Sequence, residues 1–128
     1  MPDPAEIRVT VERYTQVFSA GDKEGYVGLF AADATLEDPV GAGVHTGTAA
    51  INAFWDQTRE MTAEIELVIT GPIRVAGNEA AFPGEARPLL GDDRMSVPIV
   101  DTLSFDDDGK ITALRAFWDF ADLKPYEG

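Results

Sequence analysis

The sequence contains no cysteine and a single histidine. The absence of cysteine excludes a disulfide framework and thiol chemistry, and one histidine cannot build a metal site of several histidines. Basic residues are also few: 10 lysines and arginines stand against 23 aspartates and glutamates, for a formal net charge of −13. Because affinity for nucleic acid rests on basic side chains that neutralise phosphates, this balance argues against a nucleic-acid partner.

Long apolar runs and targeting signals are missing as well. No run approaches the length of a membrane span, so we expect no membrane association. Residues 1–6 have neither the basic region nor the apolar core of a signal peptide. We therefore expect a cytoplasmic protein.

The length and composition are those of a globular protein. The 128 residues suit one domain, residues 1–128, and a hydrophobic content of 45% supplies one core. With its acidic balance, the chain is compatible with a neutral or apolar small molecule as ligand.

Helical patterning dominates the first half of the chain. Asp3 and Pro4 are typical of a helix start, and the helix that follows has a buried stripe of Ile7, Val11, Tyr14 and Phe18. Asp22 is a candidate N-cap for a shorter helix that runs through Phe30. A third helix is predicted from Thr46 or Thr48 to about residue 58.

From residue 63 onward the apolar pattern changes to period two, which is typical of strands. Strands are predicted at 65–69, around residue 75, and at 80–86, 95–105 and 110–120. A hairpin turn at 106–109 joins the last two, and a loose tail follows. Helices first and strands afterwards predict an α+β fold, with three N-terminal helices packed on one face of a mainly antiparallel sheet.

One candidate for chemistry is Asp38, at the end of a short predicted strand. Ala34, Leu36 and Asp38 alternate, so Asp38 faces the apolar side, and Pro39 ends the strand. A carboxylate held there is a candidate base. The alternative interpretation is that Asp38-Pro39 simply begins a turn.

Asp101 and Tyr14 are the other two candidates. Asp101 interrupts an apolar strand face, where an unpartnered carboxylate would cost several kcal/mol. It can pair with a cation, or stay protonated and become a hydrogen-bond donor; alternatively, it lies at a bulge and points to water. Tyr14 is either an ordinary core tyrosine or a phenol whose partner is a substrate oxygen.

Two further aromatic or titratable residues have more ordinary interpretations. Trp118 shares a face of the last predicted strand with Leu114, and the opposite face is also partly apolar. One face could line a cavity and the other could contact a second subunit, although a two-sided core explains both. His45, in a glycine-rich loop without a catalytic partner, is expected at the surface.

Six stretches carry, in order, a resemblance to a known family: Arg13-Tyr14 with Gly21-Asp22, 31–41, 50–54, 70–74, 100–106 and 116–118. Through them the sequence resembles the steroid delta-isomerases (ketosteroid isomerases) of the NTF2-like, or SnoaL-like, superfamily. The resemblance implies a curved sheet that forms a conical cavity with the helices. It also implies a homodimer that forms through the outer sheet face.

The family chemistry transfers to matching positions. It implies that Asp38 is the general base that converts a 3-oxo-delta-5-steroid to its delta-4 isomer through a dienolate. Tyr14 and a protonated Asp101 are implied as the two donors of an oxyanion hole, without metal or organic cofactor. The resemblance further implies four contacts to the apolar steroid: Phe54, Phe82, Leu114 and Trp118.

The sequence also departs from the family pattern. Phe30 and Trp55 stand where supporting tyrosines are expected, although the Trp55 indole N–H could replace one donor. Gly84 stands where a bulky pocket residue is expected. Two alternatives remain: a polyketide-cyclase-like or epoxide-hydrolase-like enzyme, and a non-catalytic dimer that binds apolar ligands. An epoxide hydrolase would need an arginine near paired acids, and Arg115 alternates away from Trp118.

Overall fold

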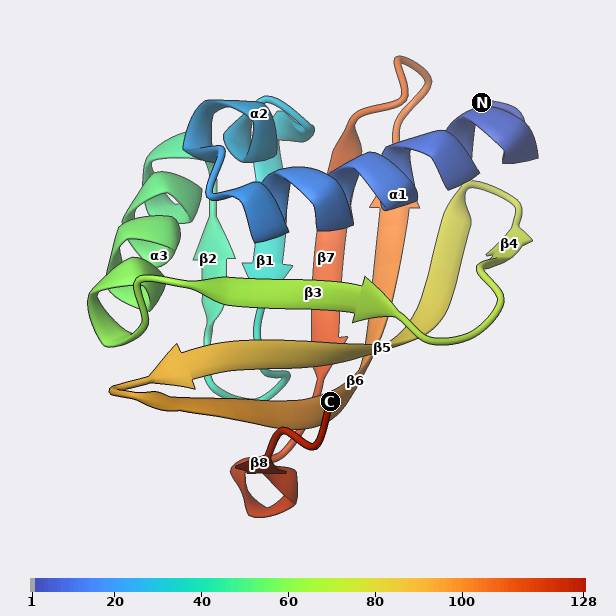
Figure 1. The fold of residues 1–128 in the computed structure, drawn as a ribbon. Coiled ribbons are helices and arrows are strands. Elements are labelled where there is room, and N and C mark those ends of the chain that lie inside the picture. Colours follow the sequence, from blue (N-terminus) through green and yellow to red (C-terminus); the bar gives the residue numbers. More distant parts are fainter. Residues whose placement is uncertain (1) are drawn as a thin grey trace.

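A computed structural model describes residues 2–128. In chain order, its elements are α1 (Pro4–Ala20), α2 (Lys23–Val27), β1 (Phe30–Glu37), β2 (Val44–Thr46), α3 (Thr48–Met61), β3 (Ile65–Ile69), β4 (Arg74–Ala76), β5 (Glu79–Leu90), β6 (Asp93–Phe105), β7 (Ile111–Phe117), the 3₁₀ turn η1 (Phe120–Asp122) and β8 (Lys124–Pro125). The fold is α+β, as predicted, with three helices packed against a curved, unclosed sheet (Figure 1).

The helix starts are explained by local sequence. The Asp3 side chain accepts a hydrogen bond from the Glu6 backbone N–H at 2.9 Å, and Pro4 occupies the first turn of α1. The helix ends at Gly21, whose φ of 72° is left-handed. Asp22 caps α2 in the same way as Asp3 caps α1.

The prediction that the second helix runs through Phe30 was wrong. α2 ends at Val27, and Phe30 begins β1. The backbone of this segment pairs with the sheet, because the Ile111 N–H donates to the Leu29 carbonyl and Phe30 lies opposite Ile111. Sheet pairing at Leu29 and Phe30 therefore ends the helix earlier than the sequence pattern predicted.

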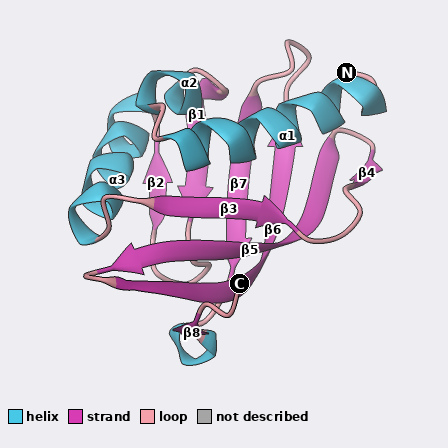
Figure 2. Ribbon diagram, in the orientation of Figure 1, coloured by secondary structure: helices cyan, strands magenta, loops and turns pink. Residues whose placement is uncertain are grey.

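The sheet has the strand order β2-β1-β7-β6-β5-β3, while β4 pairs with β5 and β8 pairs with β6. β1 and β7 are parallel, and the other ladders within residues 2–128 are antiparallel. The long strands β5 and β6 bend strongly, and β3 crosses in front of the other strands (Figure 2). This curvature leaves room between the sheet and the helices.

Three strand predictions require correction. β2 forms in the segment expected to be a glycine-rich loop, and pairs with β1 through His45 and Leu36. The last long strand ends at Phe117, because Asp119 caps the η1 turn by accepting from the Ala121 N–H. The tail is not loose, since Met95 of β6 pairs with Pro125.

The core lies between the inner face of the sheet and helices α1 and α3. α1 crosses the sheet face, and α3 packs at the side of β1 and β2 (Figure 1). The predicted inward face of β6 is buried: Val97, Ile99, Asp101, Leu103 and Phe105. Within residues 2–128, no helix is both long and apolar enough to cross a bilayer.

Candidate active site

A cavity of about 270 Å³ opens between the helices and the curved sheet. It lies just below the usual range of ligand pockets, roughly 300–1,000 Å³. Tyr14, Asp38 and Asp101 all line it, so the fold brings the three predicted catalytic residues together. Phe54 and Trp118 also line it, as predicted for ligand contacts. The other lining residues are apolar or threonine: Phe18, Pro39, Thr58, Met61, Thr62, Ile65, Leu67, Ala86, Pro88, Leu90, Val97, Ile99, Ala116, Phe120 and Leu123.

Asp101 is held in the middle of the sheet. Its strand pairs on both sides, with Phe82 of β5 and Ala116 of β7 opposite Asp101. The pairing is regular at this point, so the alternative of a bulge that points Asp101 to water was wrong. The residue is only 2% exposed, and burial raises the pKa of its carboxyl well above the usual range. The charge of Asp38 raises it further, which favours the neutral acid.

Tyr14 projects from α1 toward the same carboxyl. Its hydroxyl donates to Oδ2 of Asp101 over a long 3.4 Å, and its ring is buried. Burial, and next the neighbouring Asp101, raise the pKa of Tyr14 well above its ordinary value. The phenol therefore stays protonated. Because its hydrogen bond to Asp101 is long, the Tyr14 O–H is available to donate to the oxygen of a ligand that enters the cavity.

Asp38 lies directly after β1 and lines the same cavity. The loop that carries it is tied to β7, because the Val40 N–H donates to the Ala116 carbonyl at 2.8 Å. Trp118 Nε1 donates to Oδ1 of Asp38 at 2.6 Å. Burial raises the pKa of Asp38, whereas the Trp118 hydrogen bond and nearby His45 lower it. Asp38-Pro39 is thus both a turn and the holder of a cavity carboxyl.

The two carboxyls have different environments within one cavity. Asp101 is fully desolvated beside a like charge, while Asp38 keeps a hydrogen-bond donor that stabilises its ionised form. Environments that separate the pKa values of two titratable groups are the usual basis for assigning an acid and a base. The arrangement therefore places a neutral donor and an ionisable acceptor around the same apolar space.

An aromatic cluster lies behind Tyr14 and contains the two departures from the family pattern. The Phe30 ring centroid is 5.1 Å from that of Tyr26, and the Trp55 centroid is 4.8 Å from it. No hydrogen bond joins the Trp55 indole to Tyr14 in the described part of the chain, so the suggested replacement donor is not seen. Tyr26 of α2 is the centre of this cluster, with ring contacts to Tyr14, Phe18, Phe30 and Trp55.

Two predicted ligand contacts lie elsewhere. Phe82 and Leu114 are each 1% exposed and belong to the core, not to the lining of the cavity. Leu114 is enclosed by its sheet neighbours, since it lies between Leu36 and Leu103 in register. Gly84 leaves no room for a bulky residue: an added Cβ would lie 2.8 Å from the Val68 carbonyl oxygen.

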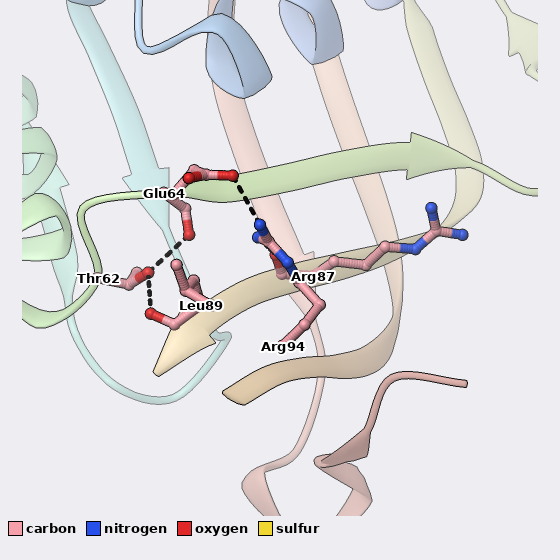
Figure 3. Close-up of polar contacts among 5 residues, drawn as sticks. All are labelled: Thr62, Glu64, Arg87, Leu89 and Arg94. Atoms are coloured by element: carbon pink, nitrogen blue, oxygen red, sulfur yellow. Dashed lines mark hydrogen bonds and ion pairs between the residues drawn. The ribbon is translucent and has the colours of Figure 1, made fainter. Parts of the chain in front are cut away.

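The hydroxyls of both threonines that line the cavity, Thr58 and Thr62, already contact backbone carbonyls. The Thr62 hydroxyl contacts the carbonyls of Glu64 and Leu89, at 2.7 and 2.9 Å, and Arg94 pairs with Glu64 (Figure 3). Thr58 donates to the carbonyl of Phe54. The polar groups available to a ligand are therefore concentrated at Tyr14, Asp38 and Asp101.

Several site residues escaped sequence reasoning. Pro88, Leu90 and Val97 line the cavity because β5 and β6 bend back toward α3, and an alternating pattern carries no information about that bend. His45 lies on β2 with its ring centroid 4.9 Å from that of Phe54, half-buried and not on the surface as predicted. Trp118 was expected as a ligand contact. Its hydrogen bond to Asp38 could not be predicted, because the sequence shows only that an indole N–H is present and not which group it contacts.

Comparisons with known proteins show the family to which this chain belongs. The SnoaL-like domain family matches residues 11–114. A protein named Steroid Delta-isomerase, from Nocardioides simplex, is 37% identical over 119 residues, which cover 93% of this chain and 94% of that protein. The chain belongs to the steroid delta-isomerase family of SnoaL-like domains.

The fold of this family member also matches a solved enzyme of different description. The structure of SalBIII, an epoxide hydrolase/cyclase-like enzyme with a role in pyran ring formation in the polyether salinomycin, superposes with a TM-score of 0.88. The two chains are 26% identical, and the match covers 98% of this chain and 100% of SalBIII. The same fold therefore occurs in proteins described as an isomerase and as an epoxide hydrolase/cyclase-like enzyme.

The buried carboxyl predicts an unusual dependence of stability on pH. Because the pKa of Asp101 is raised on folding, the folded state holds its proton above the unfolded pKa of about 3.9, and stability falls as pH rises toward the folded value. Asp101→Asn should therefore gain melting temperature relative to wild type as the pH increases, measured by thermal unfolding across that range. Asp33→Asn, at an exposed position of β1, is the control. A difference that stays constant with pH would contradict this account.

Proposed function

We propose that this protein isomerises 3-oxo-delta-5-steroids to their conjugated delta-4 isomers. The observation that carries the proposal is the pair of buried donors, Tyr14 and Asp101, in the same apolar cavity as the ionisable Asp38. The relative named Steroid Delta-isomerase supports it, since the likeness extends over nearly the whole chain.

The chemistry follows from the charges that the reaction moves. Asp38 removes a proton from the carbon between the ketone and the double bond; the electron pair of that C–H bond forms a new C=C bond to the carbonyl carbon, and the π pair of the C=O bond moves to the ketone oxygen, which gives a dienolate. Tyr14 and neutral Asp101 donate to that oxygen, and donors already in place stabilise the new charge with little reorganisation. Asp38 then returns the proton to the far carbon of the original double bond, which completes the shift.

The shape and polarity of the cavity suit a flat apolar substrate with one polar end. Its wall is formed by aliphatic and aromatic residues such as Leu67, Val97 and Ile99. The threonine hydroxyls are already bonded to backbone carbonyls. The wall can therefore pack against the hydrocarbon skeleton of a ligand without leaving hydrogen-bond donors unsatisfied. Burial of such a skeleton contributes binding energy at roughly 25 cal/mol per Å².

The epoxide-hydrolase alternative has less support. Such an enzyme needs a cation beside paired acids to position water, and no arginine is among the described residues that line the cavity. Arg115 pairs with Glu37 at 3.0 Å on the outer side of the sheet. The likeness to SalBIII therefore supports the fold more than the reaction.

The decisive measurement is the ultraviolet absorbance of a conjugated enone formed from a 3-oxo-delta-5-steroid. Wild type should turn the substrate over, and Asp38→Asn should lose about 10²–10⁴-fold in kcat, the usual contribution of a general base. Asp33→Asn, at an exposed aspartate of β1, the strand that precedes Asp38, should keep wild-type activity. Steroid binding without turnover by wild type would favour a carrier instead, and full activity of Asp38→Asn would exclude Asp38 as the base.

The bond from Trp118 to Asp38 predicts a shift in the pH profile. Trp118→Phe removes the N–H donor that lowers the pKa of Asp38, so burial would raise that pKa further. Because the base acts when ionised, the acidic limb of kcat/KM should move to higher pH. Phe120→Leu, which alters the aromatic neighbour of Trp118 without touching the donor, is the control. An unmoved limb would contradict the assignment.

We also propose a homodimer formed through the outer sheet face. Val100 and Phe117 lie opposite each other in the β6–β7 ladder and are 44% and 41% exposed, on the face away from the cavity. Val100→Asp would place a charge in that contact, so sedimentation should show a shift from dimer to monomer. Val9→Asp, at an exposed site on α1, should not change the assembly. A wild-type monomer, or an equal effect of both variants, would rule out this interface.

A further inference from the structure

His45 is the single histidine of the chain, and it lies on β2, beside the strand that leads to Asp38. In the antiparallel β1–β2 ladder, His45 is directly opposite Leu36, which is fully buried. Cross-strand partners share a face of the sheet, so His45 is on the inner face. Asp38 follows Leu36 by two residues and lines the cavity. His45 and Asp38 are therefore diagonal neighbours, which lie roughly 7–8 Å apart in a regular ladder.

The imidazole of His45 packs on the wall of the cavity without lining the cavity itself. Its ring centroid is 4.9 Å from that of Phe54, which is a lining residue, whereas His45 is half-buried and is not. The contact with Phe54 holds the imidazole in place next to the cavity. His45 is therefore placed to act on the groups of the cavity through its charge, and not by contact with a ligand.

Asp38 follows β1 on the side of the sheet that His45 faces, and it is the carboxyl on which a charge at position 45 can act. β2 packs against β1 and α3. The other charged residues of these two elements have partners of their own or contact solvent: Asp33 and Glu60 are exposed, Glu37 pairs with Arg115, Asp56 pairs with Lys23, and Arg59 lies over the Trp55 ring.

The charge of His45 distinguishes between the two carboxyls of the cavity. Burial raises the pKa of Asp38, and the Trp118 hydrogen bond and then His45 lower it. The pKa of Asp101 is governed instead by burial, by the charge of Asp38 and by the hydrogen bond from Tyr14. A cation at position 45 therefore favours the ionised form of Asp38 while Asp101 stays neutral.

We propose that His45 is a positioning residue that acts through Asp38 and, when protonated, keeps this base ionised at acidic pH; the inference rests on the proposed function. Imidazole is the side chain that changes charge between about pH 5 and 8. The imidazolium is present in the acidic range, where Asp38 would otherwise take up a proton. It is absent at alkaline pH, where Asp38 is ionised without it. His45 therefore extends activity to lower pH and has no effect at high pH.

The test is a series of charges at one position. His45→Gln removes the charge, so the acidic limb of kcat/KM should move to higher pH by about half a unit, or three-fold in rate, the effect of a unit charge roughly 7 Å away across water. His45→Lys keeps a cation and should keep the wild-type limb. His45→Glu reverses the charge and should move the limb further than His45→Gln. At alkaline pH, wild type and His45→Gln should have equal kcat/KM.

Lys23→Gln is the matched control, because it removes one positive charge from a half-exposed lysine that pairs with Asp56. Its acidic limb should coincide with that of wild type. A purely structural role of His45 would lower kcat/KM by the same factor at every pH and would not order the variants by charge. That result, or an unmoved limb in His45→Gln, would overturn the inference. The order can be read from any two variants that fold, so the loss of one leaves the test intact.

A second measurement does not depend on turnover. The pH at which the side-chain carboxyl resonance of Asp38 titrates, followed by carbon NMR without steroid, should have the same order across the variants. If it has, and wild type does not turn over a 3-oxo-delta-5-steroid, the proposed function fails and the coupling of His45 to Asp38 stands. If wild type isomerises the steroid and Asp38 titrates alike in every variant, the inference fails and the proposed function stands.

Discussion

The desolvated carboxyl of Asp101 is the constraint on which the rest of the site depends. It lies on a central strand that is paired on both sides. The backbone hydrogen bonds of these two ladders fix its position, so the strand cannot shift to expose the side chain to water. No cation in the described chain pairs with it, and its one side-chain bond is the long contact from Tyr14. Under those conditions the neutral acid is the favoured form, because ionisation would place an uncompensated charge in an apolar wall.

The architecture supplies that apolar wall from elements far apart in the sequence. The bend of β5 and β6 carries Pro88, Leu90 and Val97 over toward α3, and the contacts of Thr62 with Glu64 and Leu89 hold this arrangement. The same bend excludes water from the strand face that carries Asp101. The curvature of the sheet therefore affects the pKa of Asp101 as well as the shape of the cavity. A flatter sheet would leave the carboxyl in water, where it would ionise.

Much of the fold follows from local chemistry that a sequence displays. The caps at Asp3 and Asp22, the period-two pattern of β6 and the placement of Asp101 on its buried face are short-range features, and all three were predictable. The end of α2 was not predictable from local sequence. The Leu29 carbonyl accepts a hydrogen bond from the backbone N–H of Ile111, more than eighty residues away. Phe82 and Leu114 face inward as alternation indicates, but alternation cannot tell a core position from a cavity wall.

The requirements on the two carboxyls conflict, and Trp118 offsets part of the effect of burial on Asp38. A cavity apolar enough to keep Asp101 neutral also raises the pKa of Asp38, and a protonated Asp38 could not remove a proton from carbon. A second buried charge would relieve Asp38 but would also ionise Asp101. A neutral N–H donor to Oδ1 of Asp38 stabilises that carboxylate without adding a formal charge to the cavity. The indole at position 118 is therefore better suited than any cation to keep an acid and a base in the same small cavity.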